Sequence, residues 1–546
     1  SGKSVLMNMT NIALCLSPGI KRLPRISILD IGWSSKGFID LMHDALPNHM
    51  KHLVIYKKLA NTKEFCMNPM DTKVGCRFPI SVDLTYLINL VTLLITDSET
   101  KKIESGVTDF VRVLIEKTYE TYSDSSSYQK TTPYEYTSLT EPNVDSALKK
   151  IGVKLNISNQ IDTNSLNGFV KPTTWWDVVD ILSSNGYWEE AAIANRHAVP
   201  TLNDLVGVAY SNEAIQSSYK EFTVNENENI FSAIRRTMDA ALKAYPILSG
   251  RTLFNFGSAK LISLNLEDVA KSISNESAKQ TAVMYMYAMK LISGDFFVGD
   301  DSVNEMPFKF GASLPEDFEK HKKNYIEFHT KRIEEIKEDK KRLSVDEFHR
   351  TQSSPSVRNQ IMVYMREGRK WGVEVVLASQ SIDDFEDTMI EFATTIFVMS
   401  ADSQNIITKI VEKIGFKDPA EVTSLKNDIR PPSSDGNVFM MKVSNDETSY
   451  TQVLRNKMGP VQLWSLSTTV QDVKLRGKVF AEVGSEVGRK LLAVAYPSGS
   501  AKSDIERREF MMRSNGAAYH FDVYDELVKE MILRYGNRFN ITKKFN

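Results

Sequence analysis

The sequence is poor in cysteine, carries almost no excess of charge and lacks a long hydrophobic run. Its three cysteines, in a chain of 546 residues, include no CxxC pair, which argues against a disulfide framework or a zinc site and favours a reducing, cytoplasmic setting. The net charge of −2 is evidence against a surface that binds nucleic acid throughout, although it permits a local basic channel. The most apolar run, residues 84–95, is too short to cross a bilayer and predicts a buried helix.

Histidine is also scarce, with eight residues in the chain. None of them has the HExxH spacing of a metalloprotease or a cysteine partner, so we interpret them as solvated or structural. The polar run Ser467-Thr468-Thr469 lacks the G-x-S-x-G pattern of a nucleophile elbow. The sequence therefore gives no indication of a zinc hydrolase or a serine hydrolase.

What is present is the composition of an ordinary globular protein, with 42% hydrophobic and 25% charged residues and length for roughly two to four domains. Strand-like and helical segments alternate in residues 1–80, helical periodicity dominates in 81–250, and the alternation returns in 251–510. Such alternation predicts an α/β core with a mostly parallel sheet. We expect two parts of one core around an all-helical insertion, and a helical tail at 511–546.

Strands are expected at 25–29, 53–56, 251–266, 343–347, 373–380, 396–400 and 438–443. In the insertion, Trp175 belongs to an apolar stripe with helical spacing, and this favours core packing over base stacking for the Trp175-Trp176 pair. The charge-dense segment 316–342 is expected to be a solvated helix or extension.

The chain opens with Ser1-Gly2-Lys3-Ser4, and apolar residues suited to a buried helix face follow. Gly-Lys-Ser ends the pattern G-x-x-x-x-G-K-[ST], in which backbone N–H groups surround phosphates, Lys reaches the terminal phosphates and Ser or Thr ligates Mg²⁺. The first four positions of that pattern would precede Ser1. A three-residue string also arises by chance, so a phosphate site here needs support from the rest of the sequence.

Asp346 and Glu347 follow a candidate strand, and open α/β sheets bind their ligands at that edge. In a nucleotide-hydrolysing site the first acid would hold Mg²⁺ and the second would polarise the attacking water. Acidic pairs are also common on surfaces. Moreover, Lys341, Arg342 and Ser344 make this strand unusually polar for a central parallel one.

A coherent unit follows the acids: residues 357–371 have the period of an amphipathic helix, Gly372 ends it, and VEVVLASQ predicts a strand that ends at Gln380. A polar side chain at the tip of the strand beside the acidic one is suited to sensing a terminal phosphate.

The same helix carries Arg358, Arg366 and Arg369 away from its apolar stripe. An arginine that enters a neighbouring subunit's site would stabilise charge on the transferred phosphoryl group. The alternative for each arginine is a solvated helix face.

Several motifs in collinear order resemble the ATPase domain of the type IV secretion and conjugation traffic ATPases, the VirB class, and are most similar to its IcmB/DotO and TraU branch. They are SGKSVLMN, LDIGWSSKGFIDLM, NPMDTKVGCRFP, VDEFHRT, MREGRKWGVEVVLASQSIDDF, FATTIFVMS and MGPVQLWSLSTTVQDVKLR. The similarity extends from Ser1 to about Arg508 and is least distinct in the helical insertion. A collinear series of motifs is much stronger evidence than any one of them.

The resemblance implies a RecA-like P-loop NTPase core with an all-helical subdomain inserted between its nucleotide-binding motifs. By motif, the implied nucleotide-binding residues are Ser1, Gly2, Lys3 and Ser4, and the implied Mg²⁺ ligands are Ser4 and Asp346. The implied catalytic residues are Lys3, Glu347, the sensor Gln380 and, acting in trans, Arg366 and Arg369. The chain departs from the family pattern in the polar acidic strand and in His349-Arg350 after the acids.

The implied function is Mg²⁺-dependent ATP hydrolysis that energises assembly of, or substrate transport through, a bacterial type IV secretion system. Implied partners are other secretion components, including an inner-membrane complex and a partner ATPase, and the implied assembly is a homo-hexamer or a dimer-based ring. The expected location is cytoplasmic and peripheral at the inner membrane. Two alternatives are a nucleotide-binding scaffold with little turnover and a DNA-translocating motor, of which the near-neutral charge disfavours the second.

Overall fold

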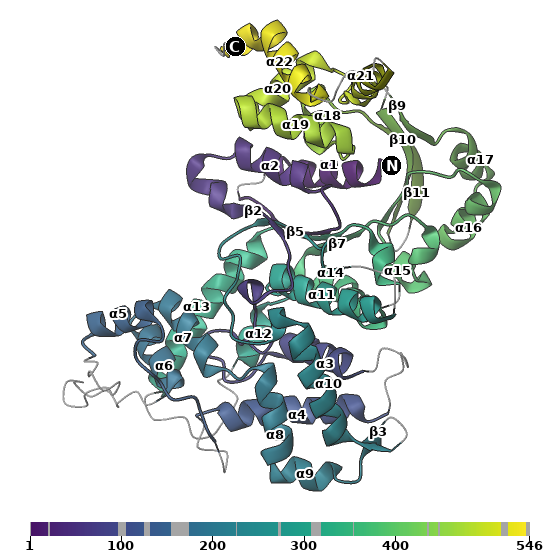
Figure 1. The fold of residues 1–546 in the computed structure, drawn as a ribbon. Helices are drawn as coiled ribbons and strands as arrows, with labels where there is room; N and C mark the ends of the chain where they lie inside the picture. The colour runs from purple at the N-terminus through teal and green to yellow at the C-terminus, as the bar shows by residue number, and fades with distance from the viewer. Residues whose placement is uncertain are drawn as a thin grey trace.

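A computed structural model gives the fold of the chain (Figure 1). The residues that it describes are 2–19, 22–96, 105–124, 131–153, 174–224, 227–270, 275–306, 318–352, 354–433, 436–445, 448–514 and 522–541.

A five-stranded parallel sheet lies at the centre of the molecule. From edge to edge its strands are β2 (Val54–Lys58), β5 (Leu261–Asn265), β1 (Arg25–Asp30), β6 (Lys341–Val345) and β7 (Val373–Leu377). Every residue of β5 and β6 is buried, as expected for central strands of a sheet that is covered on both faces. Leu29 pairs with Val345, so β1 and β6 end side by side.

Helices cover both faces of this sheet (Figure 1). On one face, α1 (Lys3–Cys15) and α2 (Lys36–Ala45) share an apolar cluster with Ile26 and Ile28 of β1. On the other face, α11 (Asn275–Ser293) and α14 (Pro355–Trp371) pack against β1 and β7. The predicted fold class, an α/β core with a mostly parallel sheet flanked by helices, is confirmed.

The polar residues of β6 have a structural role. Arg342 is 6% exposed, and its guanidinium donates hydrogen bonds to Glu374 Oε2 in β7, at 2.7 Å, and to Asn11 Oδ1 in α1, at 2.9 Å. A buried charge is tolerated when it is paired in this way. The polar residue Arg342 of β6 therefore links α1 to the sheet by hydrogen bonds.

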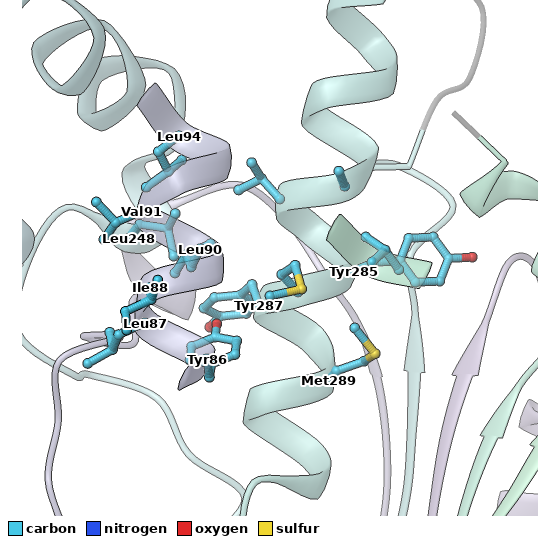
Figure 2. Close-up of a cluster of buried hydrophobic side chains, with 14 of the residues drawn as sticks. Tyr86, Leu87, Ile88, Leu90, Val91, Leu94, Leu248, Tyr285, Tyr287 and Met289 are labelled. Carbon is cyan, nitrogen blue, oxygen red and sulfur yellow. The ribbon is translucent and has the colours of Figure 1, made fainter. Parts of the chain in front are cut away.

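The chain between β2 and β5 forms the helical insertion. Its helices are α3 (Ser81–Ile95), α4 (Val107–Tyr122), α5 (Pro142–Ile151), α6 (Trp175–Ser184), α7 (Trp188–Ala198), α8 (Leu202–Ser211), α9 (Glu213–Tyr219) and α10 (Ile230–Ala244). A two-stranded hairpin, β3 (Thr223–Val224) and β4 (Glu228–Asn229), lies between α9 and α10. Figure 2 shows side chains of α3 facing Tyr287 of α11, within an apolar cluster that reaches from the insertion to the sheet. The insertion and the α/β core thus share one hydrophobic core.

Two expectations for buried and solvated segments have different outcomes. Trp175 and Trp176 are 3% and 1% exposed, and Trp176 Nε1 donates to the carbonyl of Tyr122, which confirms core packing. The charge-dense segment forms α13 (Phe318–Glu338) after α12 (Asp300–Glu305). The prediction of a solvated helix is wrong for one face of α13, because Tyr325 and His329 are buried there against the insertion.

A second sheet stands apart from the parallel one and is antiparallel. Its strands are β8 (Thr395–Val398), β9 (Arg430–Ser433), β10 (Gly436–Ser444) and β11 (Ser449–Asn456), and α15 (Asp387–Phe392), α16 (Gln404–Ile414) and α17 (Pro419–Asn427) accompany them. The sequence pattern puts two of these strands, β8 and β10, into the α/β core, and that expectation is wrong because they belong to the separate antiparallel sheet. The strand expected at 251–266 is also shorter than predicted, because β5 begins only at Leu261.

The last helices are α18 (Pro460–Leu466), α19 (Val470–Val483), α20 (Ser485–Ala495), α21 (Lys502–Ser514) and α22 (Val523–Tyr535), which share an apolar cluster. The expected boundary at residue 511 falls inside α21. This helical bundle touches the core where α18 meets α2: a Cβ added to Gly37 would overlap the carbonyl oxygen of Ser465. In the part of the chain that the structure describes, no helix combines the length and hydropathy needed to span a membrane.

Candidate functional site

The first turn of α1 lies against the acids that follow β6. Ser4 Oγ donates a hydrogen bond of 2.7 Å to Asp346 Oδ2, and Lys3 Nζ lies 2.7 Å from Glu347 Oε1 and 3.6 Å from Asp346 Oδ1. These contacts join residues more than 340 positions apart, since Ser4 and Asp346 are separated by 342. The fold thus brings together the two motifs from which the sequence predicts a single site.

Glu347 is held in a constrained conformation. Its φ of 53° lies in the left-handed region, which non-glycine residues rarely adopt and which costs of order 1–3 kcal/mol. Its backbone N–H donates to Asp346 Oδ1 at 2.9 Å. This turn directs the side chain towards Lys3, where Gln380 Nε2 donates to Glu347 Oε2 at 2.8 Å and His349 Nδ1 lies 3.2 Å from the same oxygen.

The charge state of Glu347 follows from these neighbours. Partial burial is the largest single effect and would raise the pKa of Glu347, but the hydrogen bond and charge of Lys3 and the hydrogen bond of Gln380 outweigh it. The pKa of Glu347 therefore lies below its ordinary value. The carboxylate is ionised at neutral pH, as a group that polarises water must be.

A third acid, Asp30, lies beside Asp346 at the same end of the sheet. It ends β1 beside Asp346, is 1% exposed and accepts hydrogen bonds from the backbone N–H of Ser35 and from the hydroxyls of Ser34 and Ser35. Ser34 Oγ also lies 3.1 Å from Asp346 Oδ2. Burial raises the pKa of Asp30, Asp346 raises it further, and the serine hydrogen bonds oppose the rise.

Sequence reasoning missed Asp30 as a site residue, although a signal existed. Asp30 directly follows the apolar residues Ile28 and Leu29, and Asp346 directly follows Val345 of β6. In neighbouring parallel strands with matched register, two such residues meet at one edge of the sheet.

The start of α1 offers further groups for an anion. The first backbone hydrogen bond in this helix runs from the Leu6 N–H to the Gly2 carbonyl, so the N–H groups of Lys3, Ser4 and Val5 lie in the unpaired first turn. Among the described side chains, none caps this end by a hydrogen bond to it. Free N–H groups, the helix dipole and the Lys3 ammonium together favour a phosphate group here.

The oxygen atoms of Ser4 and Asp346 suit Mg²⁺ better than a metal ion that is held by protein side chains alone. In the described ranges, no group of three or more His, Cys, Asp and Glu side chains is arranged to hold a metal ion. Mg²⁺ instead prefers one or two protein oxygens together with phosphate and water oxygens. The Ser4 hydroxyl and the Asp346 carboxylate provide such a pair.

The remaining predicted residues lie elsewhere. Arg366 and Arg369 are exposed in the last turns of α14, which leads into β7 and so ends at the edge of the sheet opposite the acids. Arg366 packs over the ring of Phe392, 5.6 Å from its centroid. Neither arginine is thus near the carboxylates of its own chain, and Ser1 lies outside the described residues.

Comparison with known proteins found no matching family model and no matching curated protein. Among solved structures, the chain is similar to VirB4 of Thermoanaerobacter pseudethanolicus, with 12% identity, a TM-score of 0.44, and coverage of 85% of this chain and 88% of that one. It is also similar to the genome packaging NTPase B204 from Sulfolobus turreted icosahedral virus 2, solved in complex with ATP-gammaS, with 14% identity, a TM-score of 0.18, and coverage of 30% and 76%.

Proposed function

We propose that this chain is a P-loop ATPase that hydrolyses ATP with Mg²⁺. The observation that carries the proposal is the convergence of Lys3 and Ser4, at the start of a helix, on Asp346 and Glu347, at the end of a central parallel strand. A lysine, a hydroxyl and two acids at the carboxyl edge of such a sheet are the groups that phosphoryl transfer needs.

Each side chain has a role that its position supports. The Lys3 ammonium neutralises phosphate charge, and the Glu347 carboxylate orients and polarises the attacking water. Gln380, hydrogen-bonded to Glu347, senses the terminal phosphate. Mg²⁺, held by Ser4 and Asp346, would spread the negative charge of the phosphates.

The ion pair between Lys3 and Glu347 has a mechanistic consequence. A phosphate bound at the start of α1 would compete with Glu347 for the Lys3 ammonium, which lies 2.7 Å from Glu347 Oε1. Phosphate binding would therefore draw Lys3 away from Glu347 and leave that carboxylate free for water.

We further propose that hydrolysis energises assembly of, or transport through, a type IV secretion apparatus, as the collinear motifs suggest. In this proposal the subunits form a ring, Arg366 and Arg369 act on the neighbouring subunit's site, and other secretion components are the partners.

The test compares steady-state ATP hydrolysis by the wild type and the Glu347→Gln variant. We expect a loss of at least 100-fold in kcat with nucleotide binding retained, because loss of the water-polarising group affects the chemical step. Lys3→Ala should instead weaken nucleotide binding.

The control is Glu367→Gln, which removes an exposed acid of α14 and should leave the rate unchanged. Equal, near-zero rates for wild type and Glu347→Gln, with nucleotide still bound, would favour the scaffold. Stimulation of the wild-type rate by sheared DNA would favour a DNA-translocating motor.

A further inference from the structure

The start of α1 is bordered by a side chain from the second sheet. Asn437, the second residue of β10, lies beside Gly2, where a Cβ added to Gly2 would overlap the Asn437 amide nitrogen. Figure 1 shows the marked N-terminus next to β10 and β11. The second sheet thus contributes to the wall of the phosphate site, although it shares no strand with the parallel sheet.

The Asn437 amide is buried and unpartnered. The residue is 7% exposed, and neither Oδ1 nor Nδ2 has a hydrogen-bond partner. Buried polar side chains are nearly always paired, because a buried group left unpaired keeps the full cost of losing its hydrogen bonds to water. An amide with two donors and an acceptor, held at the start of a helix, therefore points to a ligand that is polar and lies at Gly2.

The local backbone explains why the amide stays there. Gly436, with φ of 105°, begins β10 in a conformation that favours glycine, and the pairing of β10 with β9 shifts its register between Gly436 and Val438. On the other side Asn437 pairs with Asn456 of β11. The hairpin thereby fixes the direction of Asn437, and the half-buried Met399 has its Cε on the same side of Gly2.

We propose that Asn437 binds the phosphate chain of the nucleotide, with its Nδ2 donating to a phosphate oxygen beside Gly2. This inference rests on the proposed function and adds a residue that none of the sequence motifs contains. It also makes the β10–β11 hairpin sensitive to the nucleotide, because the phosphate would satisfy the side chain that the hairpin holds. Asn437 is thus a binding residue and a link between the two sheets.

Binding of a nonhydrolysable ATP analogue with Mg²⁺, measured by calorimetry, tests this inference. A hydrogen bond to a charged group is worth enough that Asn437→Ala should weaken binding about tenfold. The isosteric Asn437→Asp should weaken it more, because its carboxylate repels phosphate. Gln452→Ala is the control: it removes an exposed amide from the same hairpin and should bind like the wild type.

Hydrogen exchange gives a readout that does not depend on activity. Adding the analogue should slow exchange in β10 and β11 of the wild type and of Gln452→Ala, and should not do so in either Asn437 variant. The melting temperature of each protein without nucleotide shows whether it is folded, and Asn437→Asp, which keeps the shape of the side chain, stands in if Asn437→Ala unfolds.

The inference fails if both Asn437 variants bind the analogue with the wild-type Kd. In that case a wild type that still binds, and a Lys3→Ala variant that does not, leave the proposed function intact. A wild type that binds no nucleotide would instead overturn both the proposed function and this inference.

Discussion

Lys3 pairs with both acids that follow β6. Its ammonium lies 2.7 Å from Glu347 Oε1 and 3.6 Å from Asp346 Oδ1, so it is paired with carboxylates of the protein. Exchanging one partner for another costs less than stripping a charge of every partner. In the proposed function, phosphate binding would replace this ion pair.

His329 leads to a prediction about pH. It lies in α13 with Nε2 2.8 Å from the carbonyl of Val74, and burial lowers its pKa from 6.5 to about 4, helped by the charges of Arg332 and Lys73. A histidine with a depressed pKa in the folded state contributes stability above pH 6.5, which is lost as the pH falls towards 4. We expect a loss of about 3 kcal/mol, measured as a lower midpoint of urea unfolding at pH 4.5 than at pH 7.5.

The His329→Gln variant should lose this part of the pH dependence, and the exposed His49→Gln should keep it. Comparing variants with the wild type removes the effects of other groups, such as Asp71, whose pKa burial raises to about 6. An unchanged pH dependence in His329→Gln would contradict the assignment.

Single residues also show how far sequence reasoning reached into the site. Lys3 and Ser4 belong to a Gly-Lys-Ser string at the start of a helix, and Asp346, Glu347 and Gln380 follow strands. The structure brings these residues together. The unpaired amide in β10 had no such pattern. Its place depends on how a distant hairpin packs against α1, which no local spacing encodes.

At the scale of elements, the contact between α2 and α18 depends on one glycine. Because a Cβ on Gly37 would overlap the carbonyl of Ser465, Gly37→Ala should push the two helices apart and cost about 1–3 kcal/mol, as overpacking does. We expect faster hydrogen exchange in α18, α19 and α20. Gly477→Ala is the matched control, because a Cβ on this glycine of α19 meets nothing within 4 Å, and alanine should stabilise the helix. Equal exchange in both variants would refute the contact.

The elements differ in how well the sequence predicted them. β1, β6 and β7 begin within two residues of their expected starts. Apolar runs mark β1 and β7 as buried strands, and Leu343 and Val345 mark the more polar β6. Their later counterparts β8 and β10 were recognised as strands but given the wrong sheet. Periodicity reports which face of a strand is buried and does not report which strand lies beside it.

At the scale of the whole molecule, the position of Arg366 and Arg369 yields a mixing experiment. Because both lie on the edge of the sheet away from their own acids, they would serve a neighbouring subunit. The double variant Arg366→Ala/Arg369→Ala and the variant Glu347→Gln should each be inactive alone. Mixed in equal amounts, they should regain a measurable fraction of wild-type ATP hydrolysis, since some interfaces then combine an intact glutamate with intact arginines.

The control uses Lys370→Ala in place of the double variant. Lys370 is an exposed residue of α14 next to Arg369, and its variant should be active alone. No recovery in a mixture shown by sedimentation to contain mixed assemblies would refute the trans role. A wild type that stays monomeric with nucleotide would refute it as well.

The order of strands in the central sheet bears on how the protein is made. β1 ends at Asp30, whereas its two neighbours, β5 and β6, begin only at Leu261 and Lys341. Until β5 has been synthesised, the nascent chain therefore exposes a hydrophobic strand with both edges open, and such a strand is prone to aggregation. Chaperone protection during synthesis matters more for this protein than for one whose strands pair in sequence.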